Sequence, residues 1–263
     1  MSTLNKTIRF TKASACGNDF LIVAGSETTD DLSSLTRRMC DRHNGVGADG
    51  VEWLFPEGEA EVTARLINAD GSNAEISGNG TRCVAAEIYS RSDKPEVAIR
   101  TGAGLKICRL MSKRDRVFEF ETDMGQAVVG AELTIDTKVR AIGTNVSMGN
   151  PHFVILVEEF PHEWQREAAM IQAQPEFPHG TNVEYVVVRS PHEIEIRLFE
   201  RGVGETQSSG TGSCASAVAA IARGRVSSPV TVVAPGGPQI VRWEDHVYLR
   251  GPATLVCQGE FFV

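Results

Sequence analysis

Residues 77–83 are Ser-Gly-Asn-Gly-Thr-Arg-Cys, and residues 209–214 are Ser-Gly-Thr-Gly-Ser-Cys. The offset between these two loops, 209 − 77, is 132 residues. A second pair of segments has the same offset, because GNDFLIV begins at Gly17 and GNPHFVI begins at Gly149. Two matches at one offset, close to half of the 263 residues, indicate a duplicated fold with a pseudo-twofold relation between its halves.

The pattern of each half predicts several strands and one buried helix. Short runs rich in β-branched and aromatic residues, bounded by Gly, Asn, Pro or Asp, predict strands at residues 20–23, 62–67, 153–157, 185–188 and 194–199. Strict alternation in the last run favours an antiparallel or mixed sheet with one solvated face. Each Ser-Gly-X-Gly loop precedes a helical pattern, at residues 83–90 and 214–223. The second pattern is apolar nearly all round, which is typical of a buried central helix.

These patterns predict an α+β fold with two pseudo-symmetric lobes. Each lobe is expected to be a curled mixed or antiparallel sheet around a central helix. A division near residue 130 makes residues 1–130 the N-terminal lobe and residues 131–263 the C-terminal lobe. Both Gly-rich loops are then expected to face a shared cleft.

Composition and charge narrow the function classes. The chain carries 26 basic and 34 acidic residues, a formal charge of −8, which argues against nucleic-acid binding. No apolar stretch approaches the length of a membrane span, and the first ten residues lack the apolar core of an export signal. Six cysteines without CxxC spacing predict free thiols. We therefore expect a soluble cytoplasmic protein that binds neither nucleic acid nor membranes.

The two loops suggest a chemistry. A Gly-rich turn that opens a helix presents unpaired N–H groups and the positive end of the helix dipole, which suits a carboxylate or phosphate. Taken singly, each loop also fits a plain tight turn into a buried helix. Two symmetric loops instead favour inversion of a stereocentre, in which one group removes a proton and the other supplies one. Neither loop has a nucleotide-binding pattern, and the histidines show no HxxH or HExxH spacing, so no metal is expected.

Several further motifs resemble those of the diaminopimelate epimerases. They are DRHNGVGADG at residues 41–50, NADGS at 68–72, MGNPH at 148–152, GTNVE at 180–184 and ERGVGETQ at 200–207. With GNDF at residues 17–20 and LRGPA at residues 249–253, they extend the resemblance from Gly17 to Ala253. The resemblance implies an isomerase without metal or cofactor that interconverts LL- and meso-diaminopimelate on the bacterial route to lysine and peptidoglycan. Members are often dimeric, which leaves a homodimer open for this chain.

The resemblance also assigns residues to the substrate. Four asparagines would bind its amino and carboxylate groups: Asn18, Asn68, Asn150 and Asn182. Arg201 would clamp the distal carboxylate, Glu200 would accept from a substrate ammonium group, and His152 would lie beside the reacting carbon. Four backbone N–H groups would hold the α-carboxylate, those of Gly78, Asn79, Gly210 and Thr211. Singly, Asn18 and Asn68 also fit turn residues, and His152 fits a loop histidine.

One departure from the family concerns the acid/base groups. The family places a cysteine directly before each Gly-X-Gly, where this chain has Ser77 and Ser209. Cys83 and Cys214 match cysteines that pack at the start of each helix and do not replace the missing thiols. A hydroxyl is harder to ionise than a thiol by about 7 pKa units, or roughly 10 kcal/mol, and a helix dipole offsets only about 1–2 kcal/mol of this. We therefore expect substrate binding with very slow turnover or none.

Three interpretations stay open at this point. The chain is an epimerase scaffold with two Cys-to-Ser replacements, or a divergent member that catalyses another isomerisation or a dehydration, or a non-catalytic protein that binds diaminopimelate-like amino acids. His152 offers a base for one serine. Retention of Glu200, Arg201 and the asparagines favours the first and third interpretations, because a new substrate should have altered the distal clamp.

Overall fold

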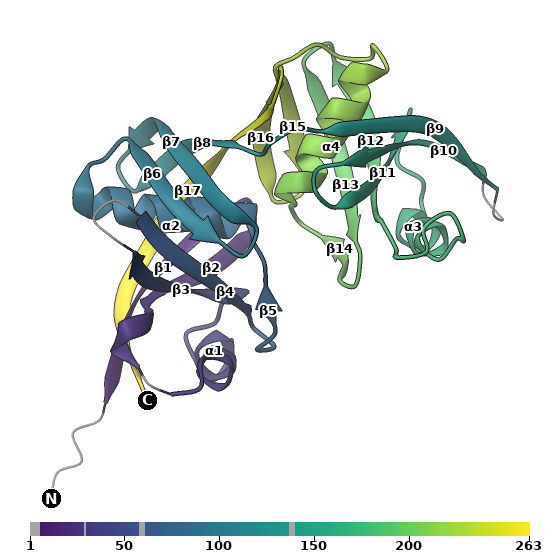
Figure 1. Ribbon diagram of the computed structural model, residues 1–263. Coiled ribbons are helices and arrows are strands. Elements are labelled where there is room, and N and C mark those ends of the chain that lie inside the picture. The colour runs from purple at the N-terminus through teal and green to yellow at the C-terminus, as the bar shows by residue number, and fades with distance from the viewer. Residues whose placement is uncertain (1–5, 29, 58–60, 137–139) are drawn as a thin grey trace, which may run out of the picture. The chain divides into compact units, whose positions relative to one another are not determined.

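The computed structural model describes residues 6–28, 30–57, 61–136 and 140–263. The chain divides into two compact units, and Figure 1 shows both. Unit 1 comprises Met1–Thr122 and Gly251–Val263, and unit 2 comprises Asp123–Arg250. This division departs from the predicted boundary near residue 130, because the chain enters unit 2 earlier and its last residues return to unit 1.

The secondary structure repeats with the offset seen in the sequence. Unit 1 contains β1 (Thr7–Ala15), β2 (Asn18–Ala24), η1 (Gly25–Glu27), α1 (Leu32–Cys40), β3 (Gly50–Glu57), β4 (Glu61–Asn68), β5 (Asn73–Ala74), α2 (Gly78–Ser92), β6 (Glu96–Thr101), β7 (Gly104–Arg114) and most of β8 (Val117–Asp123). The corresponding elements follow from β10 (Arg140–Ser147) through β11 (Pro151–Val157), α3 (Trp164–Gln172), β12 (Asn182–Ser190), β13 (Glu193–Glu200), β14 (Gly204–Thr206), α4 (Gly210–Ala222), β15 (Val230–Ala234) and β16 (Gly237–Trp243) to β17 (Val247–Phe262). The predicted strands and both predicted helical patterns fall on these elements.

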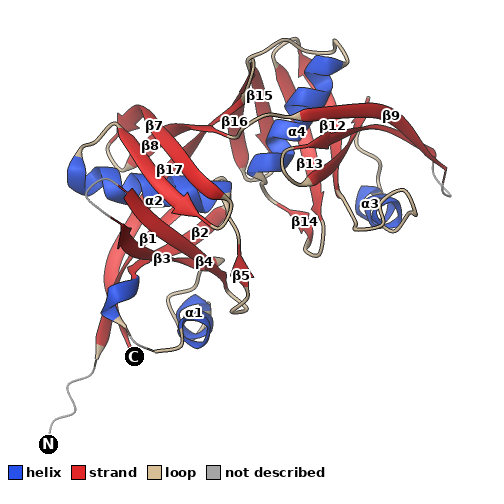
Figure 2. Cartoon of the chain, viewed as in Figure 1, coloured by secondary structure: helices blue, strands red, loops and turns tan. Residues whose placement is uncertain are grey.

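In unit 1 the strands form a closed ring. Strand β1 pairs with β2, β2 runs parallel to β3, β3 pairs with β4, and β4 runs parallel to β6. Antiparallel pairs β6–β7 and β7–β8 follow, and β17 closes the ring between β8 and β1. Figure 2 shows α2 in blue among these strands. The predicted mixed sheet around a central helix is confirmed for this unit.

Unit 2 repeats this order of pairing. Strand β9 (Val128–Asp136) pairs with β10, β10 with β11, β11 runs parallel to β12, and β12 pairs with β13. Strand β13 runs parallel to β15, and the antiparallel pairs β15–β16 and β16–β17 follow. Backbone bonds from Met124 N to Val247 O and from Val247 N to Gly125 O, both 2.8 Å long, join the two ends. The second sheet therefore also wraps round its helix, α4.

The core of each unit explains why its central helix is apolar. The alanines and the valine of α4 between residues 215 and 220 are fully buried against strands of unit 2. In unit 1, full burial is found for Cys83, Val84, Ala85 and Ala86 of α2. A second cluster in each unit lies on the other face of the strands, against α1 or α3. The strands next to α1 and α3, which include β3 and β12, are thus covered on both faces.

The ring of unit 1 contains one strand that comes from the other end of the sequence. Strand β9 follows β8 directly but pairs with β10 of unit 2. Strand β17 begins in unit 2 against β16, and its later part pairs with β1 from Thr7↔Phe262 to Ser14↔Thr254. Local patterning cannot reveal such an exchange, which is why the predicted boundary differs.

Two further expectations concern the described residues. No helix in the described ranges is long and apolar enough to span a membrane. The six cysteines form no disulfide in the described part of the chain, and all except Cys257 are buried.

Candidate functional site

The two Gly-rich loops have the same local geometry. Ser77 caps α2 with an extended backbone, and its Oγ accepts a hydrogen bond from Gly80 N at 3.1 Å. Ser209 caps α4 in the same way, accepting from Gly212 N at 3.3 Å. A serine at this position satisfies one of the N–H groups that a helix start leaves unpaired. Both predicted loops are therefore real helix N-termini, each capped by the serine that the sequence analysis singled out.

The residues assigned to carboxylate binding lie at these helix starts. Gly78 and Asn79 are the first residues of α2, and Gly210 and Thr211 are the first residues of α4. Their N–H groups precede the first intrahelical bonds, and the helix dipole favours an anion there. The geometry suits the predicted role, which stays a prediction.

In each unit, an asparagine near the Gly-rich loop forms a hydrogen bond that recurs at the equivalent positions of the other unit. In unit 1, Asn79 Nδ2 donates to Asn18 Oδ1 at 2.7 Å. In unit 2, Asn150 Nδ2 donates to Thr211 Oγ1 at 3.3 Å. Asn18 and Asn150 are 132 residues apart, and so are Asn79 and Thr211. Each unit thus joins an asparagine at or just before its second repeat strand to the second residue of its central helix.

Beyond this contact, unit 1 continues into a charged network. Asn18 Nδ2 donates to Asp49 Oδ2 at 3.0 Å, and the fully buried Arg82 donates to Asn79 Oδ1 and, at 3.3 Å, to Pro252 O. Asn68 is separate from this network, since its Nδ2 donates to Ser72 Oγ at 3.0 Å within the β4–β5 turn. The structure therefore brings Asn18 and Asn79 together and places Asn68 in the neighbouring turn, and the role of Asn68 towards the substrate stays a prediction.

Ser209 has an acidic partner in unit 2. Its Oγ donates to Glu200 Oε2 at 3.1 Å, from the loop to the end of β13. Next along the chain, the exposed Arg201 donates its backbone N–H to Asn182 Oδ1 at 2.9 Å and its guanidinium to His179 O at 2.8 Å. Asn182 is buried and donates in turn to Pro151 O at 3.0 Å. Ser209, Glu200, Arg201 and Asn182 are thus neighbours.

His152 is the centre of a buried polar chain. Its Nδ1 lies 2.7 Å from Glu184 Oε1, and its Nε2 lies 3.0 Å from Asn150 Oδ1. Because Asn150 uses its Nδ2 on Thr211, its Oδ1 accepts from Nε2, and the Nδ1 side then shares one proton with Glu184. Burial raises the pKa of Glu184, and the neighbouring His152 opposes that rise. His152 is therefore a positioned group and not a loose loop histidine.

Sequence reasoning missed two buried acids. Glu184 on β12 is 1% exposed, and Glu52 on β3 is 3% exposed. Burial alone raises the pKa of Glu52 to about 8. The two glutamates are 132 residues apart, so the repeat itself was the signal that could have found them. They become important below.

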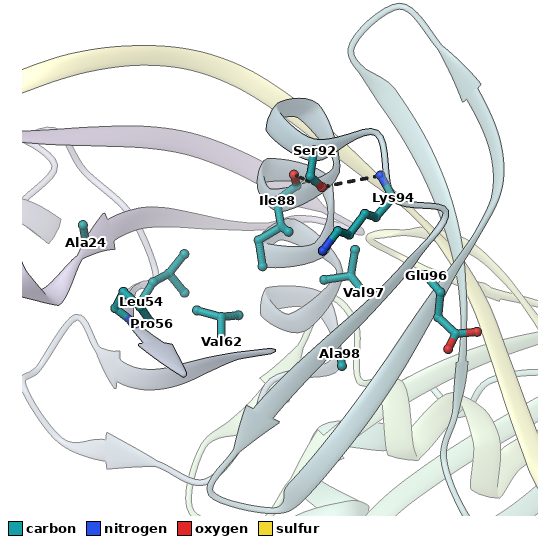
Figure 3. A pocket seen from close by; sticks show the side chains of 10 residues that line it. All are labelled: Ala24, Leu54, Pro56, Val62, Ile88, Ser92, Lys94, Glu96, Val97 and Ala98. Carbon is teal, nitrogen blue, oxygen red and sulfur yellow. Dashed lines mark hydrogen bonds between the residues drawn. The ribbon is translucent and has the colours of Figure 1, made fainter. Parts of the chain in front are cut away.

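An apolar pocket in unit 1 lies elsewhere. Its volume is about 310 Å³, and Figure 3 shows the side chains around it: Ala24, Leu54, Pro56, Val62, Ile88, Ser92, Lys94, Glu96, Val97 and Ala98. Helix α2 contributes Ile88 and Ser92 from its last turns, whereas Ser77 caps its first turn. None of the predicted site residues lines this pocket. It is not the candidate site.

The predicted site residues are divided between the two units. Unit 1 contains Asn18, Asn68, Ser77, Gly78 and Asn79, and unit 2 contains Asn150, His152, Asn182, Glu200, Arg201, Ser209, Gly210 and Thr211. The shared cleft concerns the placement of the two units, and it stays a prediction. No group of three or more potential metal ligands occurs within the described residues.

Fold comparison defines the class of protein. A proline racemase from Agrobacterium radiobacter K84, described as probable, has a TM-score of 0.70 at 16% identity, over 96% of this chain and 92% of that one. A Bacillus anthracis protein of the PhzF phenazine biosynthesis family has a TM-score of 0.72 at 14% identity, over 98% of this chain and all of that one. At these identities the likeness shows the fold alone. The chain therefore shares its fold with a protein described as a probable proline racemase and with a protein of the PhzF family.

Sequence comparison then identifies the family. The diaminopimelate epimerase model matches residues 10–129 and 144–256, one block for each repeat. A diaminopimelate epimerase from Pelotomaculum thermopropionicum is 39% identical over 97% of this chain and 99% of its own length. Another, from Methanococcus maripaludis strain C6, is 36% identical over 96% and 99%. The chain belongs to the diaminopimelate epimerase family.

Proposed function

We propose that this protein epimerises one α-carbon of diaminopimelate, converting the LL to the meso form without metal or cofactor. The observation that carries the proposal is the repeated serine-capped helix start, one in each unit. Inversion requires that one group removes the α-proton and a second delivers a proton from the other side. The repeat supplies two such groups at the same position of the same fold.

The substrate's polar groups account for the surrounding residues. The N–H groups of Gly78, Asn79, Gly210 and Thr211 hold the α-carboxylate and the negative charge that develops there on deprotonation. Arg201 binds the distal carboxylate, for which its planar guanidinium is suited. Glu200 and the asparagines Asn18, Asn68, Asn150 and Asn182 orient the amino groups. His152, fixed by Glu184 and Asn150, stands beside the reacting carbon.

Ser77 and Ser209 take the positions of the family's two acid/base cysteines. A serine hydroxyl accepts the α-proton only as it passes its own proton to a base. Ser209 has such a base, because its Oγ donates to Glu200. The missing thiolates make each step slow, since forming an alkoxide costs about 10 kcal/mol more than forming a thiolate.

Location and assembly follow from the family. We place the protein in the cytoplasm, where diaminopimelate is made for lysine and peptidoglycan. A homodimer is part of the proposal, and size-exclusion chromatography with light scattering tests it through the measured mass.

The experiment that tests the proposal is proton NMR of LL-diaminopimelate in D2O. The α-proton signal should fade slowly with the unmodified protein and much faster with a Ser77→Cys, Ser209→Cys variant. A matched control, Ser34→Cys, Ser112→Cys, places the thiols at exposed positions and should behave like the unmodified protein. If neither the unmodified protein nor the Ser77→Cys, Ser209→Cys variant reduces the α-proton signal, diaminopimelate is excluded as the substrate.

A second candidate function is binding of the same amino acid without turnover. The observation that favours it is the pair of hydroxyls at the two helix caps. Calorimetric titration with LL-diaminopimelate separates the two functions. Binding without any α-proton exchange in the unmodified protein supports a binding protein, and exchange on a scale of minutes to hours supports the epimerase.

A further inference from the structure

Each unit buries one glutamate under the first turn of its central helix. Glu52 lies on β3 between Ile22 of β2 and Leu66 of β4, all three in register. Glu184 lies on β12 between Val154 of β11 and Leu198 of β13. These four neighbours belong to the apolar cores around α2 and α4. An acid in such a place is expensive to ionise, so a structural role alone would be served as well by an uncharged side chain.

Glycines make room for both carboxyl groups beside the capping serines. A Cβ at Gly80 would lie 2.2 Å from Glu52 Oε1 and 3.3 Å from the Cβ of Ser77. A Cβ at Gly212 would lie 3.1 Å from Glu184 Oε1 and 3.2 Å from the Cβ of Ser209. Each carboxyl group therefore occupies the space that a glycine leaves open in the helix start, next to the serine.

The two serines differ in their other partners. Ser209 donates to Glu200, and Glu184 is bound to His152. The repeat counterparts of Glu200 and His152 in unit 1 are Asn68 and Phe20, neither of which can take up a proton at neutral pH. Glu52 is thus the acid that unit 1 retains at its serine loop.

Charged groups around Glu52 are reached through its neighbour Cys83 on α2. The Cys83 thiol interacts electrostatically with Glu52, with the buried Arg82 of the same helix, and with Cys16 and Asp19 of the β1–β2 region. Asp19 is neutralised by Lys12 at 2.9 Å and by Arg42 at 2.8 Å. Burial raises the pKa of Glu52 to about 8, which leaves both its forms accessible near neutral pH.

We propose that Glu52 is the positioning residue that holds and returns the proton of Ser77. The inference rests on the proposed function. When the α-proton passes to Ser77 Oγ, the hydroxyl proton of Ser77 passes to the Glu52 carboxylate, which becomes a carboxylic acid. In the opposite direction the carboxylic acid returns its proton to Ser77 as Ser77 protonates the carbon. No proton is gained or lost in the sequence, and Glu200 serves Ser209 in the same way.

The test is a Glu52→Gln variant, which keeps the size of the side chain and cannot ionise. Exchange of the α-proton is measured in D2O separately for LL- and meso-diaminopimelate, because each serine handles one configuration. We expect exchange of one isomer to fall by about tenfold or more and exchange of the other to stay within about twofold. The matched control is Glu57→Gln, an exposed acid on the same strand, for which both rates should be unchanged.

A structural role would give a different result. Equal loss for both isomers, or no loss for either, overturns the inference. Glu52→Asp keeps an ionisable group, so it should retain more exchange of the affected isomer than Glu52→Gln. An equal loss of exchange in the two variants would overturn the proposed role of Glu52. Circular dichroism and thermal unfolding verify that each variant is folded, and the Asp variant carries the test if the Gln variant is not.

Failure of the proposed function would give a different result from failure of the inference. The unmodified protein would then exchange the α-proton of neither isomer. The inference is then tested in the Ser77→Cys, Ser209→Cys variant, where Glu52→Gln must still slow one isomer selectively. Unselective behaviour there overturns the role of Glu52.

Discussion

The loops of Ser77 and Ser209 share one backbone plan and differ in the groups behind it. Both have a serine cap, a glycine three residues on and a buried glutamate beside that glycine. Unit 2 adds His152, Glu200 and Arg201, where unit 1 has Phe20, Asn68 and Ala69. The two repeats thus share the geometry of a helix start and differ in the side chains around it. Arg201, the proposed distal clamp, and the imidazole of His152 belong to one repeat only.

The largest expected effect is on ligand binding, and it is expected for Arg201, whose repeat counterpart in unit 1 is Ala69. Arg201→Ala should weaken binding of LL-diaminopimelate by about 100-fold or more, because a charged carboxylate contact is worth roughly 2–5 kcal/mol. Calorimetric titration measures the affinity. Arg189→Ala, an exposed arginine paired with Glu195, is the matched control and should bind normally. Intact affinity in Arg201→Ala would remove the clamp assignment.

Exchanging a side chain between the repeats tests the polar chain of unit 2. His152→Phe installs the residue found at position 20 and leaves Glu184 buried, with its Oε2 already lacking a hydrogen-bond partner in the described structure. The free energy of unfolding in urea should fall by about 3 kcal/mol, the usual cost of breaking a buried pair. Adding Glu184→Leu should recover most of that loss. A double variant as unstable as the single one would show that Glu184 is not the source.

The pH dependence of the free energy of unfolding should reveal the buried acid of unit 1, Glu52. Burial raises the pKa of Glu52 from 4.5 to about 8, so the folded protein keeps a proton that the unfolded chain has released. This contribution is intact below about pH 4.5 and is lost progressively as the pH rises to about 8, at up to roughly 1.4 kcal/mol per pH unit. Urea unfolding of Glu52→Gln should therefore show a flatter decline over this range than the unmodified protein. Parallel curves would contradict the burial of an acid at this position.

The smallest effects are expected at the caps themselves. Ser77→Ala should lower the free energy of unfolding by about 1 kcal/mol, the usual cost of losing a helix cap. Ser209→Ala should cost somewhat more, because it also removes the hydrogen bond to Glu200. Urea unfolding compares the two variants. A larger loss of unfolding free energy for Ser77→Ala than for Ser209→Ala would contradict a stabilising contribution from the hydrogen bond between Ser209 and Glu200.

The sequence predicted the repeat, the central helices and both loops because these depend on local pattern. It missed Glu52 for a physical reason. Residues 51–53 are Val, Glu and Trp, an apolar-polar-apolar alternation which predicts that the glutamate faces solvent. In the fold Val51 and Trp53 pack towards α1, and the opposite face is covered by α2, so both faces are buried. The path of β17 was missed because pairing of strands far apart in sequence is not encoded in either strand alone.

The course of β17 has a consequence for the order of assembly during synthesis. Most of unit 1 is made before unit 2, yet its ring lacks one strand until residues 251–263 have emerged. Unit 2, made later, has all its residues within Asp123–Arg250. The half of the protein that is translated first is therefore the half that is completed last, with the edges of β1 and β8 exposed in the meantime.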